Sequence, residues 1–147
     1  MKKTILFICT HNSARSQMAE GLVNYYYSEY FQAKSAGTIP TMVNPYALAV
    51  MKELGIDISH QRSKPIEEFR NKTFDIVVTV CDSARETCPF FPGKIVLHRG
   101  FEDPSRATGT DYEILDVFRR IRDEIKEWIE KELVKDYSIK SDEGLKI

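Results

Sequence analysis

The segment ILFICTHNSARSQMAEG, residues 5–21, joins a strand-like run, a polar loop and helix-forming sequence within one short stretch. The apolar run ends on Cys9, five residues separate this cysteine from Arg15, and helix-forming residues follow. A buried strand that leads through a tight loop into a helix is the repeating unit of parallel α/β sheets. This segment therefore predicts both the fold class of the chain and the edge of the sheet where a site would lie.

Hydrophobic periodicity along the rest of the chain predicts strands that alternate with helices. Asn44 and Pro45 are typical of a helix N-cap and its first residue, and Gly55 is typical of a helix end. Alternating elements favour right-handed crossovers and an α/β fold of three layers, a four-stranded parallel sheet with helices on both faces. The predicted strands are 4–9, 31–36, 74–80 and 94–98, and the predicted helices are 14–30, 45–54, 63–70 and 111–135.

Length and composition restrict the function classes. A chain of 147 residues is the size of one domain, which we assign to residues 1–135 with a C-terminal tail at 136–147. The net charge of -1 disfavours nucleic acid as a partner, and no apolar run is long enough for a membrane span. The run after MKK is too short for a secretion signal, and three cysteines do not form a disulfide framework. We therefore expect a soluble, cytoplasmic monomer.

The loop after Cys9 has the features of an anion-binding site. Unpaired N–H groups and the dipole at a helix N-terminus attract a tetrahedral oxyanion, and Arg15 can hold two of its oxygens. The same positive field favours a thiolate at Cys9, which makes the sulfur nucleophilic. The alternative is a buried strand cysteine and a surface arginine. The predicted oxyanion cradle consists of Thr10, His11, Asn12, Ser13, Ala14 and Arg15.

The motif CTHNSARSQMAEG resembles the low-molecular-weight tyrosine phosphatase fold, and specifically its thioredoxin-coupled arsenate reductase branch. The resemblance extends from Lys3 to about Ile129 and implies a phosphotyrosine phosphatase I-like architecture. The further matching stretches are SAG at 35–37, NP at 44–45, MKELGIDIS at 51–59, VVTVCDSARETCP at 77–89 and GFEDPSRATGT at 100–110.

This resemblance implies a role for five residues. Cys9 would be the nucleophile, Arg15 the clamp on the oxyanion, and Ser16 the hydroxyl that hydrogen-bonds the thiolate. Asn12 would hold the shape of the loop, and Asp103 would be a general acid on a mobile loop. On its own, Asp103 is followed by proline and is typical of a turn.

Cys81 and Cys88 distinguish a reductase from a phosphatase. A phosphatase needs one thiol, whereas a reductase needs a second thiol to attack the first and a third to carry the disulfide outward. Cys81 ends a predicted strand beside that of Cys9. If the intervening residues were helical, Cys81 and Cys88 would lie ~10 Å apart, beyond disulfide reach. A Cys81–Cys88 disulfide, reduced by thioredoxin, therefore requires this segment to unwind.

The resemblance is imperfect at several positions. His11 stands where the family often has glycine, and its ring either lines the site or faces solvent. Arg99 stands where relatives carry an aromatic residue. Ser105 and Arg106 replace the paired tyrosines of many tyrosine phosphatases, which weakens the phosphatase interpretation. Asn12, Glu20 and Ser35 match positions that bind a potassium ion in some reductases of this branch, although no cofactor is required.

Two other functions and a zinc site are the alternatives to arsenate reduction. The chain could be a phosphatase that hydrolyses phosphomonoesters through a phosphorylated Cys9. It could also be a thiol-based sensor of arsenite or a metal, but this would leave Arg15 and Asp103 without a role. A zinc site that combines the cysteines with histidines lacks paired ligand spacing; the histidines are His11, His60 and His98.

Overall fold

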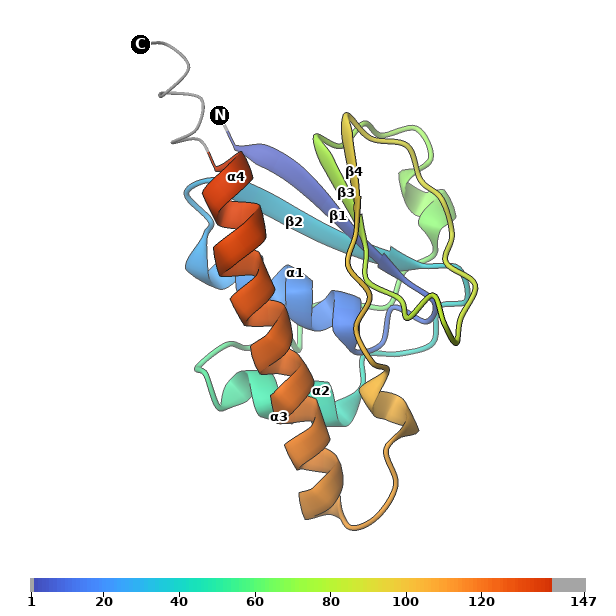
Figure 1. Cartoon of the computed structure of the whole chain (residues 1–147), viewed down its shortest axis with the longest axis vertical. Coiled ribbons are helices and arrows are strands. Elements are labelled where there is room, and N and C mark those ends of the chain that lie inside the picture. Colours follow the sequence, from blue (N-terminus) through green and yellow to red (C-terminus); the bar gives the residue numbers. More distant parts are fainter. Residues whose placement is uncertain (1, 139–147) are drawn as a thin grey trace.

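The computed structural model describes residues 2–138 of the chain, and its centre is a four-stranded sheet (Figure 1). All strand pairs are parallel, and the order is β2-β1-β3-β4. The central position of β1 explains why it is continuously apolar, since both of its faces are covered. The strands are β1 (Lys3–Cys9), β2 (Phe31–Gly37), β3 (Ile76–Thr79) and β4 (Ile95–His98).

The register of the sheet brings the ends of three strands together. Cys9 is paired with Gly37 of β2, and Ile8 with Thr79 of β3. The Val80 N–H continues this ladder by donating to the Ile8 carbonyl at 2.8 Å. Cys9 and the residues directly after β3 therefore emerge at the same carboxyl edge, where ligands bind in parallel α/β sheets.

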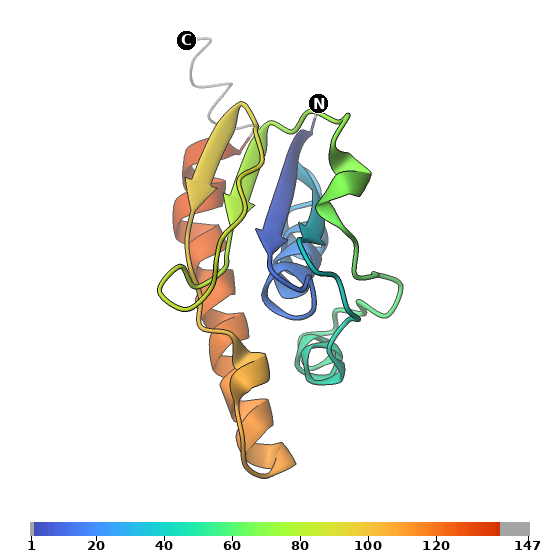
Figure 2. The same ribbon diagram turned by 90° about the vertical axis from the view of Figure 1, so that its right-hand side faces the viewer.

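Helices cover both faces of the sheet, as predicted, but different elements cover each face (Figure 2). α1 (Arg15–Tyr26), α2 (Pro45–Lys52) and α3 (Asp111–Trp128) share the core that contains Ile5 and Phe7. Leu6 and Ile8 face the opposite side, where the short 3₁₀ helix η1 (Ile66–Phe69) and Phe91 pack on them. This alternation follows from the two-residue period of a strand. The predicted three-layer α/β fold is confirmed.

The predicted end of the first helix was wrong. α1 ends at Tyr26, not Tyr30, because the chain must turn before Phe31 to pair with Lys3. The last helix ends close to the predicted position of about Lys135, because α3 passes through the π-helical η3 (Ile129–Val134) into α4 (Lys135–Tyr137). Residues 139–147 of the predicted tail lie outside the described part of the chain. Another 3₁₀ helix, η2 (Pro104–Arg106), follows β4.

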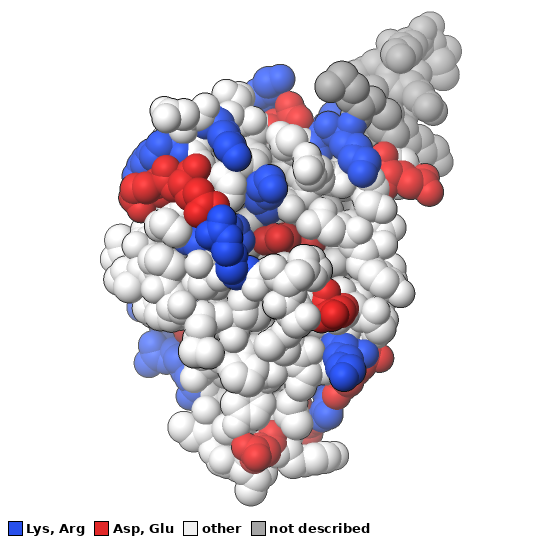
Figure 3. All heavy atoms as spheres, turned by 180° about the vertical axis from the view of Figure 1, so that it is seen from behind, with Lys and Arg blue, Asp and Glu red and all other residues white. Residues whose placement is uncertain are grey.

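On the face shown in Figure 3, basic and acidic side chains are interspersed. None of the helices within residues 2–138 combines the length and the apolar character that crossing a bilayer requires.

Candidate active site

Cys9 lies at the end of β1 with its side chain buried and its thiol free. Its Sγ is 2.8 Å from the Oγ of Ser16, in the first turn of α1. The amide of Asn12 donates to the same Oγ at 2.8 Å, so the Ser16 hydroxyl keeps its own proton for the sulfur. The Ser16 hydroxyl is thus placed to donate a hydrogen bond to the Cys9 sulfur.

Asn12 determines the shape of the loop between β1 and α1. Its φ of 50° is left-handed, a conformation that asparagine tolerates better than most residues. The side-chain Oδ1 accepts hydrogen bonds from Gln17 Nε2 and from the Lys64 N–H, both at 2.9 Å. Because the residue is fully buried, these bonds hold the loop in one conformation around the sulfur.

The start of α1 offers donors to an anion. Ala14, at the N-cap position, makes no side-chain cap, and the first turn of the helix contains no acidic residue. The first N–H groups of α1 thus lack a side-chain acceptor and are directed toward the loop. Together with the helix dipole they form the kind of site that binds phosphate-like groups.

Gly37, the residue paired with Cys9 on β2, lies under this loop. A Cβ at this position would come within 2.6 Å of the Thr10 carbonyl oxygen and 2.8 Å of the Asn12 nitrogen. Both atoms belong to the backbone and cannot rotate away.

We expect Gly37→Ala to destabilise the fold by about 1–3 kcal/mol and to weaken phosphate binding, because the loop must move outward. Urea denaturation and calorimetric titration of the reduced protein measure the two effects. Gly93→Ala is the control, since its Cβ would meet the Val77 side chain at 2.6 Å in another part of the fold. Unchanged phosphate affinity in Gly37→Ala would show that the loop does not hold the anion.

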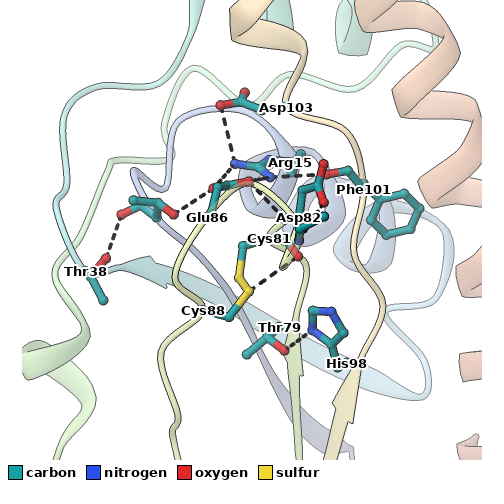
Figure 4. Close-up of a disulfide and its surroundings, with 12 residues drawn as sticks. Arg15, Thr38, Thr79, Cys81, Asp82, Glu86, Cys88, His98, Phe101 and Asp103 are labelled. Atoms are coloured by element: carbon teal, nitrogen blue, oxygen red, sulfur yellow. Dashed lines mark hydrogen bonds and ion pairs between the residues drawn. A yellow bond between two sulfur atoms is a disulfide. The ribbon is translucent and has the colours of Figure 1, made fainter.

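Arg15 is 3 % exposed and points across the mouth of the loop (Figure 4). Its Nη1 and Nη2 lie 2.5 and 2.9 Å from the two carboxylate oxygens of Glu86, and Nη1 also donates to the Phe101 carbonyl at 3.2 Å. Asp103 Oδ2 lies 3.6 Å from Nη2. Burial lowers the pKa of Arg15, but the bond to Glu86 and the charges of Cys9 and Asp103 outweigh it and raise the pKa. The guanidinium is therefore charged at every working pH.

Asp103 has two environments at once. Its Oδ1 accepts from the N–H and the hydroxyl of Ser105, at 3.0 and 2.7 Å, so it caps η2 as the Asp-Pro sequence predicts. Its other oxygen faces Arg15. The residue also lines a cleft of about 680 Å³, together with Thr10, His11 and Glu86. Asp103 can therefore form the turn with one carboxylate oxygen and face Arg15 with the other.

Cys81 and Cys88 form a disulfide, with their Cα atoms 5.9 Å apart. The intervening residues 82–87 form turns in place of a helix, and the N–H groups of Arg85 and Glu86 both bond the Asp82 carbonyl. Cys81 is fully buried, whereas Cys88 is half-buried. The structure thus represents an oxidised form in which Cys9 is still a thiol.

The family model for low molecular weight phosphotyrosine protein phosphatases matches residues 4–142. The chain belongs to this family. A relative named arsenate reductase, from Halalkalibacterium halodurans, is 50% identical over 125 residues, which cover 84% of this chain and 90% of the relative.

Two solved structures of the same phosphatase fold are informative. An arsenate reductase in the phosphate binding state is 37% identical, has a TM-score of 0.77, and is matched over 94% of this chain and 100% of that one. A thioredoxin-dependent arsenate reductase from Corynebacterium glutamicum is 31% identical with a TM-score of 0.64, over 88% of this chain and 61% of that chain.

Of the three predicted potassium ligands, Glu20 and Ser35 lie in contact with each other. Glu20 Oε1 accepts a hydrogen bond from Ser35 at 2.5 Å, while the Asn12 side chain is occupied by Ser16 and the loop. The ammonium of Lys64 lies 3.7 Å from Glu20 and supplies positive charge at this point. Burial lowers the pKa of Lys64, and the carboxylate of Glu20 opposes this. Potassium binding here stays a prediction.

The structure shows the contacts of His11 and Arg99, two residues that depart from the family pattern. His11 lines the cleft, and its Nδ1 donates to the Ile39 carbonyl at 3.0 Å. The Arg99 guanidinium lies 4.3 Å from the centre of the Phe101 ring, the residue whose carbonyl binds Arg15. Within residues 2–138, no cluster of three His, Cys, Asp or Glu side chains is arranged to hold a metal ion.

Glu86 and Lys64 are site residues that sequence reasoning missed. Glu86 lies within the DSARET segment between Cys81 and Cys88, so an acidic residue between two cysteines was the available signal. Lys64 had no such signal, since it reaches Glu20 from a distant loop.

Proposed function

We propose that this protein reduces arsenate to arsenite through Cys9, with a disulfide relay from Cys9 through Cys81 to Cys88 that thioredoxin resets. The observation that carries the proposal is the Cys81–Cys88 disulfide next to the loop of Cys9. Hydrolysis of a phosphate ester uses one thiol and would give Cys81 and Cys88 no role in the reaction. Reduction requires two electrons from thiols, and the pair provides a place for the resulting disulfide.

In the first step, arsenate binds over the N-terminus of α1, held by loop N–H groups and the Arg15 guanidinium. The Cys9 thiolate, stabilised by the Ser16 hydroxyl at 2.8 Å, attacks arsenic. One arsenate oxygen leaves as water after it receives a proton, and we assign the role of general acid to Asp103, whose Oδ2 lies 3.6 Å from Arg15 Nη2. The product is an arsenic–sulfur adduct on Cys9.

In the second step, the Cys81 thiolate attacks the Cys9 sulfur. The electron pair of the sulfur–arsenic bond passes to arsenic, which leaves as arsenite, and a Cys9–Cys81 disulfide remains. Cys88 then attacks Cys81, which frees the Cys9 thiolate and forms the Cys81–Cys88 bond found in the structure. Exchange with a thioredoxin dithiol reduces this bond and completes the cycle. This chemistry belongs to the cytoplasm, where thioredoxin is kept reduced.

The relatives support the same assignment. The matched H. halodurans protein is an arsenate reductase, and the C. glutamicum structure is of a thioredoxin-dependent one. The second candidate is phosphatase activity, because the family is named for it and Cys9, Arg15 and Asp103 suffice for ester hydrolysis. A thiol sensor is not favoured, since it would not need Arg15 buried at the site.

A side-by-side assay tests the proposal. We expect NADPH oxidation that depends on arsenate, thioredoxin and thioredoxin reductase, with phosphate as a competitor. An aryl phosphate and the reduced protein should give slow hydrolysis at most. Rapid ester hydrolysis without arsenate turnover would identify a phosphatase, and arsenite capture that phosphate does not affect would identify a sensor.

A further inference from the structure

The carboxylate of Glu86 is bound to Arg15 and Thr10, two of the residues predicted to hold an oxyanion. Both of its oxygens are held by the Arg15 guanidinium, in the two-pronged geometry that arginine also uses for phosphate. Thr10, the first residue of the cradle, donates its hydroxyl to Oε1 at 2.7 Å, and the Asp82 N–H donates to Oε2 at 2.9 Å. The side chain of Glu86 is 13% exposed.

Glu86 is an anion under all physiological conditions. Burial disfavours its charge, but hydrogen bonds from Arg15, Thr10 and the Asp82 amide outweigh burial and lower the pKa of Glu86 to about 2. A negative charge is thus already paired with the one guanidinium that arsenate or phosphate would need. A second anion at Arg15 would have to displace this carboxylate or share the cation with it.

Glu86 lies within the segment that the disulfide closes. The residue lies two positions before Cys88, in turns that close the 5.9 Å Cα distance between Cys81 and Cys88. A helical segment would separate these cysteines by ~10 Å, so the turns and the disulfide occur together. Reduction removes the covalent restraint that holds Glu86 against Arg15 and Thr10.

We propose that Glu86 is an internal ligand of the oxyanion site, present when Cys81 and Cys88 are joined and withdrawn when they are reduced. It is a positioning residue that acts through Arg15 and Thr10. The oxidised enzyme then excludes oxyanions until thioredoxin has reset it, and formation of the disulfide clears the cradle after arsenite has left. This rests on the proposed function for its place in the cycle.

The coupling must be reciprocal. If the disulfide weakens oxyanion binding, a bound oxyanion weakens the disulfide by the same factor. Phosphate should therefore favour the dithiol form in a thiol–disulfide equilibrium. If Glu86 were only a brace for the turn, neither effect would occur.

Calorimetric titration of inorganic phosphate into the oxidised and dithiothreitol-reduced full chain tests the inference. For the wild type we expect the reduced form to bind phosphate at least about tenfold more tightly than the oxidised form, a ratio of affinities that is usual for coupled sites. In Glu86→Gln the two forms should bind phosphate within about threefold of each other. Glu102→Gln is the charge-matched control, since Glu102 pairs with Arg120 and not Arg15, and should retain the wild-type difference.

Equal phosphate affinity of the two wild-type forms, or a redox difference that survives in Glu86→Gln, would overturn the inference. A second measurement needs no variant: the wild-type Cys81–Cys88 equilibrium in a dithiothreitol buffer should shift toward dithiol when phosphate is added. An unshifted equilibrium would likewise overturn it. Neither measurement uses arsenate, so a negative result would not contradict the proposed arsenate reduction. Conversely, control of oxyanion binding by Glu86 could be found even if the protein were a phosphatase.

Discussion

Replacing Cys88 with serine should let each protein molecule release about one arsenite and then stop, even with excess thioredoxin. Cys9 and Cys81 can still complete the first two steps, but position 88 no longer carries the thiol that would attack Cys81 and release Cys9. The Cys9–Cys81 bond would stay at two buried residues, out of reach of a protein reductant. The burst amplitude of arsenite per mole of enzyme measures this.

Ser83→Ala is the matched control for the Cys88 variant. Ser83 lies in the same turn segment but is exposed and carries no thiol. This variant should sustain turnover at nearly the wild-type rate. Continuous arsenite production by Cys88→Ser at a comparable rate would mean that thioredoxin reaches Cys81 directly and that the third thiol is dispensable.

Replacing Arg15 with lysine should lower kcat/KM for arsenate by about 10²- to 10³-fold, the usual loss when an oxyanion donor is removed. The ammonium keeps the charge but cannot hold two oxygens side by side. It also leaves Glu86 and the Phe101 carbonyl without their shared partner. Steady-state kinetics and phosphate affinity of the reduced protein should decline together.

Arg85→Lys provides the comparison for the Arg15 variant. Arg85 lines the same cleft, but it is 66% exposed and pairs only loosely with Asp82, at 3.7 Å. A lysine there should change kcat/KM by no more than about threefold, as for most exposed charges. If Arg15→Lys behaved like Arg85→Lys, the guanidinium would not be the oxyanion clamp.

Local sequence signals predicted most of the fold. Asn44 and Pro45 begin α2 as expected, with the Asn44 side chain accepting from the Tyr46 N–H at 2.8 Å. The continuous apolar run of β1 correctly indicated a strand covered on both faces. The end of α1 was mistaken because Tyr25–Tyr30 continues a helical pattern, whereas sheet register, which is not local, determines where the turn must begin.

The candidate site was only partly predictable, for the same reason. One strand–loop–helix unit contains Cys9, Asn12, Arg15 and Ser16. The sequence itself therefore indicates that these residues lie close together. Glu86 lies 71 residues from Arg15, and only the closed Cys81–Cys88 turn brings its carboxylate to the guanidinium.

Asp103 reaches Arg15 from another distant loop, and the role predicted for it rests on the family resemblance alone. Asp-Pro alone indicates a turn, and the structure shows that turn as well as the approach of Asp103 to Arg15. Sequence therefore predicts the centre of the site better than its surroundings.

The most direct test is peptide mapping of Cys88→Ser after exposure of the reduced protein to arsenate. Mass spectrometry of the unreduced digest should find one disulfide-linked peptide pair, Cys9 with Cys81, in an amount equal to the arsenite released. Arsenite release with Cys9 still a free thiol, or with a disulfide that excludes Cys9, would contradict the relay at its first step.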